Sequence, residues 1–218
     1  MPYRNWDRLN TPWLNRLEAA GVSRDEIDYV CCTHLHVDHV GWNTQLVDGT
    51  WVPTFPNARY LFSQAELDHV RRELSGLEPD DSFGAVNAKT YEDSVAPILQ
   101  QADLITQNQP LDETGIELLL TPGHTPGSMT LRLTSEAQPV YFTGDVCHHP
   151  IQVLYPSMNS AYCQIPDVAI ATRRDLLTRC DDENALLLPA HFGPPHGCRV
   201  RAEATSFTPV WEPMSKPS

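Results

Sequence analysis

The sequence lacks the features that mark several large classes of protein. No apolar run approaches the roughly 20 residues of a membrane-spanning helix. Basic residues are few, because 15 Lys and Arg stand against 28 Asp and Glu, which gives a formal net charge of -13. Binding to nucleic acid requires a basic surface that meets the phosphates. We therefore expect neither a membrane nor a nucleic acid as a partner, and we expect a small-molecule substrate instead.

The sequence also has no CxxC pair, no glycine-rich phosphate loop and no dinucleotide-binding fingerprint. A chain of 218 residues can bury a sizeable core without disulfides. We therefore interpret its six cysteines as reduced packing residues, which suits the cytoplasm, and the N-terminus does not read as a signal peptide. Cys147, two positions after Asp145, is either buried filler or part of a metal site.

Against these absences stands a dense cluster of metal-ligand residues at residues 33–39, THLHVDH. Side chains at i and i+2 of an extended segment point the same way, so His34 and His36 can bind one ion. Asp38 and His39, at the following turn, can reach a second ion. Imidazole nitrogen and carboxylate oxygen are the usual ligands of catalytic zinc. Chance clustering of surface histidines is the ordinary alternative.

Three later segments offer further ligands at positions where a scaffold would hold them. His124 lies between two Pro-Gly turns in TPGHTPG, which fix a loop. Asp145 follows the apolar strand YFTG, and His191 follows the apolar run LLLPA. Each of these alone would be an ordinary residue. Together with the first cluster they predict a metal site built from strand ends and stiff loops.

The first cluster resembles the HxHxDH motif of the metallo-β-lactamase superfamily, and the three later residues match its remaining ligand positions. The resemblance implies that His34, His36 and His124 bind one metal. It implies that Asp38, His39 and His191 bind a second metal, with Asp145 bridging the two. The segments HVGWNT at 39–44 and GDVCHHPIQ at 144–152 are similar to the branch that holds methyl parathion hydrolase and the N-acyl homoserine lactonases.

The resemblance implies a dinuclear hydrolase in which a metal-bridging hydroxide attacks a small ester, lactone or organophosphate. Zinc is the default ion for an imidazole-rich site, and manganese, cobalt or iron would also suit mixed nitrogen and oxygen ligands. Asp145 and Asp38 are the expected catalytic residues. Asp145 would hold both ions, and Asp38 would bind the second ion and could pass a proton to the leaving group.

Residues that contact the substrate are harder to identify. Lactonases of this branch often place a tyrosine three residues after the bridging aspartate, where this chain has His148, followed by His149. Both histidines either contact substrate or are ordinary hydrogen-bonded residues. Several aromatic and apolar side chains either line a pocket beside the metals or belong to the core. These are Trp42, Phe55, Tyr155, Met158 and Tyr162.

Three alternative functions stay open at this point. A thioesterase of the glyoxalase II type is the nearest alternative. A mononuclear-iron oxygenase of the same superfamily would use fewer ligands, and the intact set Asp38, His39 and His191 argues against it. The third alternative is a truncated, non-catalytic remnant of such an enzyme.

Hydrophobic periodicity and turn signals predict alternating helices and strands. A helix starts at Thr11 as N-cap and Pro12 as first residue and stops at Gly21. Ser63 and Glu66 form a capping box that opens another helix, with Leu67, Val70 and Leu74 on one face. Further helices are expected over 90–102 and over 167–180, the second with Ala169, Leu176 and Cys180 toward the core. Strands or extended segments are expected over 27–33, 51–55, 58–62, 116–120, 129–133, 140–143 and 186–188.

The predicted fold class is α/β, and the resemblance implies an αββα sandwich of the metallo-β-lactamase type. We expect one domain over residues 1–218, with a loose tail from about residue 198. Family members usually carry several strands before the HxHxDH segment, whereas here one helix and one strand precede it. We therefore expect part of the N-terminal sheet to be missing. The chain would be a fragment, begin internally, or have another subunit over the open face, as in a homodimer.

Overall fold

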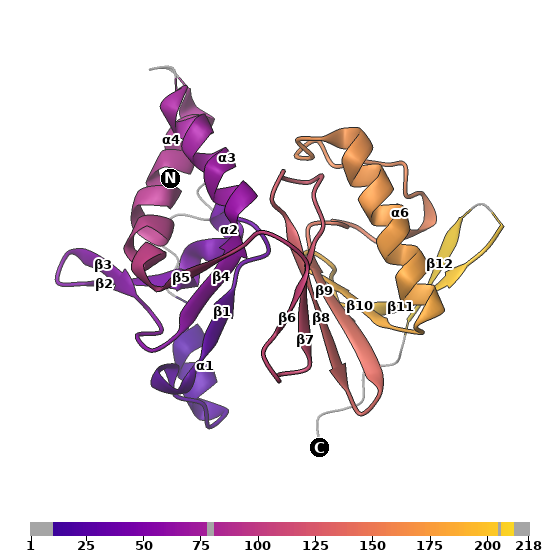
Figure 1. Ribbon diagram of the computed structural model, residues 1–218, viewed down its shortest axis with the longest axis horizontal. Coiled ribbons are helices and arrows are strands. Elements are labelled where there is room, and N and C mark those ends of the chain that lie inside the picture. Colours follow the sequence, from indigo (N-terminus) through magenta and orange to yellow (C-terminus); the bar gives the residue numbers. More distant parts are fainter. Residues whose placement is uncertain (1–10, 78–80, 205, 212–218) are drawn as a thin grey trace. The chain divides into compact units, whose positions relative to one another are not determined.

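A computed structural model describes residues 11–77, 81–204 and 206–211 of the chain (Figure 1). The chain divides into two compact units. The described residues up to Phe62 and the segment Leu67–Leu104 form unit 1. Unit 2 consists of Ser63–Glu66 and the described residues from Ile105 onward. The expectation of one domain stays a prediction.

Unit 1 is built on a three-stranded sheet of order β1-β4-β5. Its strands are β1 (Tyr29–Cys31), β4 (Arg59–Ser63) and β5 (Ala102–Ile105). β1 and β4 are parallel, with Tyr29 opposite Arg59. A separate antiparallel hairpin consists of β2 (Thr44–Val47) and β3 (Thr50–Pro53).

Strands and helices of unit 1 share one hydrophobic core. Tyr60, Phe62, Leu67 and Ile98 are almost fully buried in this core. Val70 packs against it, which confirms Leu67 and Val70 on the predicted apolar face of the helix that begins after Ser63, whereas Leu74 is only half-buried. The helices that lie wholly or mostly in this unit are α1 (Trp13–Ala19), α2 (Val37–Val40), α3 (Gln64–Ser75) and α4 (Ser82–Thr90), with short turns η1 (Arg24–Glu26) and η2 (Gly41–Asn43). The first turn of α3, up to Glu66, belongs to unit 2.

Unit 2 contains a seven-stranded sheet of order β12-β11-β10-β9-β8-β7-β6. β9 and β10 are parallel, and the other neighbouring strands of this sheet are antiparallel. Its strands are β6 (Gln109–Leu111), β7 (Ile116–Leu120), β8 (Met129–Ser135), β9 (Gln138–Gly144), β10 (Leu186–Pro189), β11 (Cys198–Ala202) and β12 (Phe207–Val210).

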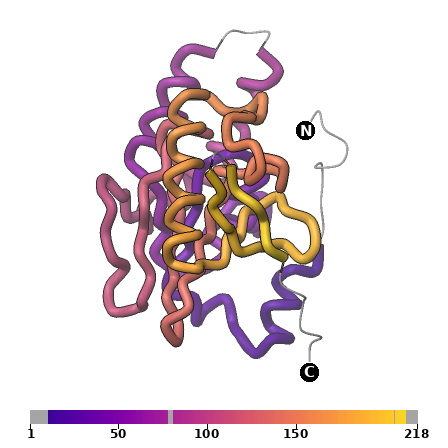
Figure 2. The backbone as a smooth tube through the Cα atoms, turned by 90° about the vertical axis from the view of Figure 1, so that its right-hand side faces the viewer, coloured from indigo at the N-terminus to yellow at the C-terminus, as the bar shows by residue number. Residues whose placement is uncertain are grey.

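Helix α6 (Pro166–Asp182) makes the crossover between the two parallel strands of unit 2. In Figures 1 and 2, α6 runs beside β11. Its buried face contains Ala169, Leu176 and Cys180, as the sequence predicted for this helix. The short helix α5 (Ile151–Leu154) precedes it.

The expected loose tail from about residue 198 is wrong for the described residues. β11 pairs with β10, and β12 pairs with β11, so the sheet continues to Val210. Cys198 and Val200 are fully buried, and the residues that follow them, Arg199 and Arg201, are not. This alternation is typical of a strand with one face in the core and one face in solvent. The alternation was missed in the sequence because the segment is short, polar in composition and contains proline.

Other boundaries also differ from the sequence analysis. The predicted helix over 90–102 is helical, but as a π-helical turn η3 (Tyr91–Val95) followed by a 3-10 helix η4 (Ala96–Gln101). Pro97, near the start of η4, cannot donate a backbone hydrogen bond, which explains the change of helix type. The N-cap of α1 is Pro12, not Thr11.

None of the described helices is long and apolar enough to cross a membrane.

Candidate metal centre

In unit 1, the predicted ligand cluster lies directly after β1 and runs into α2. His36 has extended backbone angles and is the N-cap of α2, which contains Asp38 and His39. The Nε2 atom of His34 lies 3.0 Å from the Nδ1 atom of His36. The His34 ring is also 4.0 Å from the His39 ring, between centroids, and His39 Nε2 is 3.6 Å from Asp38 Oδ2. The four predicted ligands of this segment are therefore neighbours.

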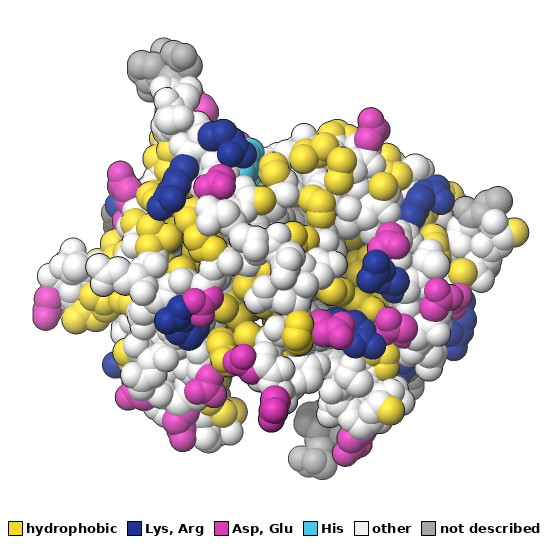
Figure 3. All heavy atoms as spheres, viewed as in Figure 1, with side chains coloured by type: hydrophobic (Ala, Val, Ile, Leu, Met, Phe, Trp, Pro, Cys, Tyr) yellow, Lys and Arg dark blue, Asp and Glu magenta, His cyan; other side chains and the backbone are white. Residues whose placement is uncertain are grey.

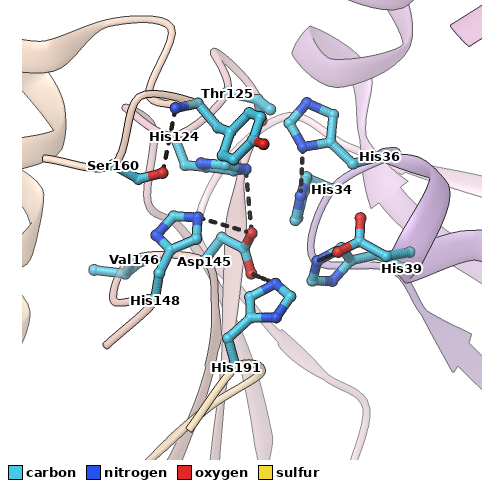
Figure 4. Close-up of polar contacts among 12 residues, drawn as sticks. His34, His36, His39, His124, Thr125, Asp145, Val146, His148, Ser160 and His191 are labelled. Atoms are coloured by element: carbon cyan, nitrogen blue, oxygen red, sulfur yellow. Dashed lines mark hydrogen bonds and ion pairs between the residues drawn. The ribbon is translucent and has the colours of Figure 1, made fainter. Parts of the chain in front are cut away.

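In unit 2, three imidazoles surround one buried carboxylate (Figure 4). Asp145 Oδ2 lies 3.3 Å from His124 Nε2 and 3.1 Å from His148 Nε2. The other oxygen, Oδ1, lies 3.2 Å from His191 Nε2. Asp145 and His124 are buried, His148 is half-buried and His191 is exposed. The two faces of the Asp145 carboxylate therefore meet different histidines.

The parallel pair of strands explains why Asp145 and His191 meet. β9 ends at Gly144 and β10 ends at Pro189, and these two residues are opposite one another in the sheet. The backbone N–H of Ala190 donates to the carbonyl of Gly144 over 3.1 Å, which extends the pairing to the strand ends. Residues that follow adjacent parallel strands emerge at the same edge of a sheet.

The backbone around His124 is fixed by contacts on the α6 side of the loop. Gln164 N–H donates to the carbonyl of His124 over 2.9 Å, and Ile165 N–H donates to that of Gly123 over 3.0 Å. Gly123 has φ of +137°, and a Cβ there would lie 2.4 Å from the Cα of Ala169. The position therefore requires glycine for its backbone angle and for its close approach to α6.

Two buried polar side chains that we did not assign from sequence brace the turn that carries Asp145. Arg173 Nε donates to the carbonyl of Val146 over 2.7 Å, and its Nη1 donates to that of Pro156 over 2.6 Å. Gln152 Oε1 accepts from the backbone of His148 over 2.7 Å. Arg173 lies on the apolar face of α6 and is fully buried. An arginine on a predicted apolar face was the signal that could have revealed it.

The candidates for substrate contact lie in different environments. Phe55 belongs to the core of unit 1, which was the alternative to a place in a substrate pocket. Trp42 is exposed and packs against Trp13 with 5.5 Å between ring centroids and an angle of 31° between the ring planes. His149 accepts from the backbone of Ile151 through Nδ1 over 3.1 Å, at the start of α5. Tyr155, Met158 and Tyr162 are exposed.

The cysteines carry no disulfide, and five of the six are buried. Cys147 is fully buried, and this burial raises the pKa of its thiol to about 12. A thiol with such a pKa stays protonated near neutral pH and is a poor metal ligand. The structure therefore favours the packing role for Cys147.

The donor set of unit 2 fits a divalent cation. Two ligand atoms on a tetrahedral zinc, at about 2.0–2.1 Å each, lie about 3.3 Å apart. The separations of 3.1, 3.2 and 3.3 Å from the Asp145 oxygens to the three imidazole nitrogens match this spacing. One ligand atom from each of His124, Asp145 and His148 lies within 4.8 Å of the other two. Nitrogen and carboxylate oxygen together suit zinc, manganese, cobalt or iron.

Known proteins with the same fold include metal-dependent hydrolases. An N-acyl homoserine lactonase from Bacillus sp is 26% identical over 136 residues, which cover 62% of this chain and 44% of the lactonase. This chain thus matches less than half the length of that relative. The hydrolase AbOPH has a TM-score of 0.81 at 21% identity, over 94% of this chain and 71% of AbOPH. AidC, a dizinc quorum-quenching lactonase in complex with N-hexanoyl-L-homoserine as product, has a TM-score of 0.78 at 22% identity, over 96% of this chain and 72% of AidC.

These likenesses confirm the expected fold class, and the family follows from the sequence itself. Residues 5–191 match the metallo-beta-lactamase superfamily, and this range includes every ligand that the HxHxDH pattern and the later segments predicted. The chain belongs to the metallo-β-lactamase superfamily.

Proposed function

We propose that this protein is a metal-dependent hydrolase that uses two divalent ions to cleave a small ester, lactone or organophosphate. The observation that carries the proposal is the arrangement around Asp145. Its Oδ2 faces His124 and His148, and its Oδ1 faces His191. A carboxylate with nitrogen donors on both oxygens is suited to bridge two ions.

The motif assigns the remaining ligands. By the resemblance, His34 and His36 would join His124 on one ion, and Asp38 and His39 would join His191 on the other. The support within unit 1 is the proximity of these side chains, such as the 3.0 Å between the ring nitrogens of His34 and His36. Two divalent ions so held would supply a nucleophile from water near neutral pH and would neutralise charge that develops on the substrate oxygen.

The protein residues would then orient the substrate and move protons. Asp38 has a partly exposed carboxylate and lies beside the ligand His39, so it is placed to pass a proton to a leaving group. His148 occupies the position three residues after Asp145, and its Nε2 lies at the Asp145 carboxylate. We propose that His148 is not one of the ligands and that, once Asp145 binds the ions, its imidazole donates a hydrogen bond to a substrate oxygen in place of the tyrosine of the lactonases.

The apolar part of the substrate would lie against the segment that follows α5. Tyr155, Met158 and Tyr162 are 59%, 46% and 65% exposed, which is unusual for large apolar side chains close in sequence. Figure 3 shows hydrophobic side chains gathered over the beginning of α6, which this segment precedes. The N-hexanoyl chain of the product in AidC makes an acyl-bearing lactone the first substrate class to test.

A substrate panel tests the proposal. We expect the zinc-loaded full chain to hydrolyse at least one of an acyl lactone, an aryl ester and a phosphotriester faster than a thioester. His36→Ala should lower kcat/KM by about 100-fold or more, because it removes a ligand. His69→Ala is the matched control, since His69 lies on α3 and pairs with Glu73 rather than with the ligand cluster.

Two results would contradict the proposal. Preferred turnover of the thioester would favour a thioesterase of the glyoxalase II type. Equal activity of the His36→Ala and His69→Ala variants would show that the turnover does not depend on the predicted ligands.

A further inference from the structure

Glu66 is a buried carboxylate that does not belong to the predicted ligand set. Its side chain is 1% exposed, and it lies in the first turn of α3. Ser63 Oγ accepts from the backbone N–H of Glu66 over 3.0 Å, which confirms the serine half of the predicted capping box. The carboxylate of Glu66, however, accepts hydrogen bonds from a segment about 60 residues further along the chain.

That segment is the loop that carries His124. Thr125 Oγ1 donates to Glu66 Oε2 over 2.5 Å, and the backbone N–H of Gly127 donates to the same oxygen over 3.1 Å. Ser63 Oγ donates to the carbonyl of Gly127 over 2.6 Å. Three hydrogen bonds therefore join the short segment Ser63–Glu66 to the two residues Thr125 and Gly127.

The same contact is close enough to exclude any side chain at residue 127. A Cβ on Gly127 would lie 2.1 Å from the backbone nitrogen of Glu66 and 2.4 Å from Ser63 Oγ. The Thr125 hydroxyl also lies 2.7 Å from Ser128 Oγ, so the carboxylate anchors a network that spans the loop. His124 directly precedes this network and is held on its other side by Gln164.

We propose that Glu66 is a positioning residue that sets the orientation of His124 as a metal ligand through Thr125 and Gly127. Burying a carboxylate is costly unless it is hydrogen-bonded. An apolar side chain would fill the same space without this cost, so packing alone does not account for a carboxylate at this position. The charge is offset by two donors that belong to the ligand loop and by the N-terminus of α3. The inference rests on the proposed function, because it assumes that His124 binds a metal.

Thr125→Val tests the inference with little change of shape. The variant removes the hydroxyl and leaves Glu66 with one of its two donors in the loop. We expect the zinc dissociation constant, measured by competition with a chromophoric chelator, to rise about 10- to 100-fold. Thr125→Ser retains the hydroxyl and should bind zinc as the wild type does. Glu66→Met removes the oxygen that accepts from both Thr125 and Gly127, so it should weaken zinc binding at least as much as Thr125→Val does.

A control separates positioning of His124 from a general loss of stability. Thr114 Oγ1 also donates one hydrogen bond and accepts another, in the turn between β6 and β7. Thr114→Val should lower the melting temperature without changing zinc affinity. All variants are compared at a temperature where each is folded, and the absorption bands of the cobalt-loaded proteins report changed ligand geometry.

The outcomes distinguish the two proposals. A wild-type chain that binds no zinc would overturn both. A wild type that binds zinc, together with Thr125→Val and Glu66→Met variants that bind it within twofold of the wild type, would overturn the positioning role alone.

Discussion

At the scale of single residues, Asp145 is a buried carboxylate surrounded by three histidines. A buried carboxylate is unfavourable unless hydrogen bonds or opposite charge offset the cost. Here the carboxylate meets the imidazoles of His124, His148 and His191. A divalent cation among these ligand atoms would offset the cost further, so the arrangement is one that metal binding would stabilise.

Asp145→Asn tests this account. The amide keeps the size of the side chain and removes the charge, so zinc affinity should fall about 100-fold or more, while the metal-free protein should unfold at a similar or higher temperature. Chelator competition measures the first quantity, and thermal unfolding in EDTA measures the second. A variant that binds zinc as tightly as the wild type would show that Asp145 is not a ligand.

At the scale of elements, the parts of the site that follow strands were predictable and the parts that brace them were not. Asp145 and His191 each follow a local apolar run, which a sequence displays directly. The contact of Glu66 with Thr125 joins residues 59 positions apart, and no local pattern indicates it. From the sequence, Glu66 was therefore assigned only to a capping box, and Arg173 was given no role beyond its place in a predicted helix.

Arg173 should matter for the stability of unit 2. It is fully buried and donates to the carbonyls of Val146, Pro156 and Met158 and to the side chain of Asn159. We expect Arg173→Met to lower the free energy of unfolding by about 3 kcal/mol or more, because several buried acceptors lose their donor. Urea denaturation measures the change.

The neighbouring residue supplies the control for this prediction. Arg174 is exposed on the same helix, so Arg174→Met should change the free energy of unfolding by less than about 0.5 kcal/mol. Equal effects of the two substitutions would contradict the bracing role of Arg173.

At the scale of the whole molecule, the family and the fold class followed from one cluster of histidines and three later candidate ligands. The sheet of unit 2 extends through β11 and β12, which the sequence did not reveal because both strands are short and polar on one side. A net charge of -13 leaves the surface acidic, so bound cations would also reduce repulsion within the chain. The homodimer and the cytoplasmic location stay predictions.

The metal content of the full chain, purified without added metal, tests the central claim most directly. Elemental analysis should find two divalent ions per chain, with zinc as the expected element, because seven ligand residues are assigned to two ions that share Asp145. One iron per chain would contradict the dinuclear hydrolase and favour an oxygenase, and a chain that binds no metal even after incubation with zinc would contradict the enzymatic account altogether.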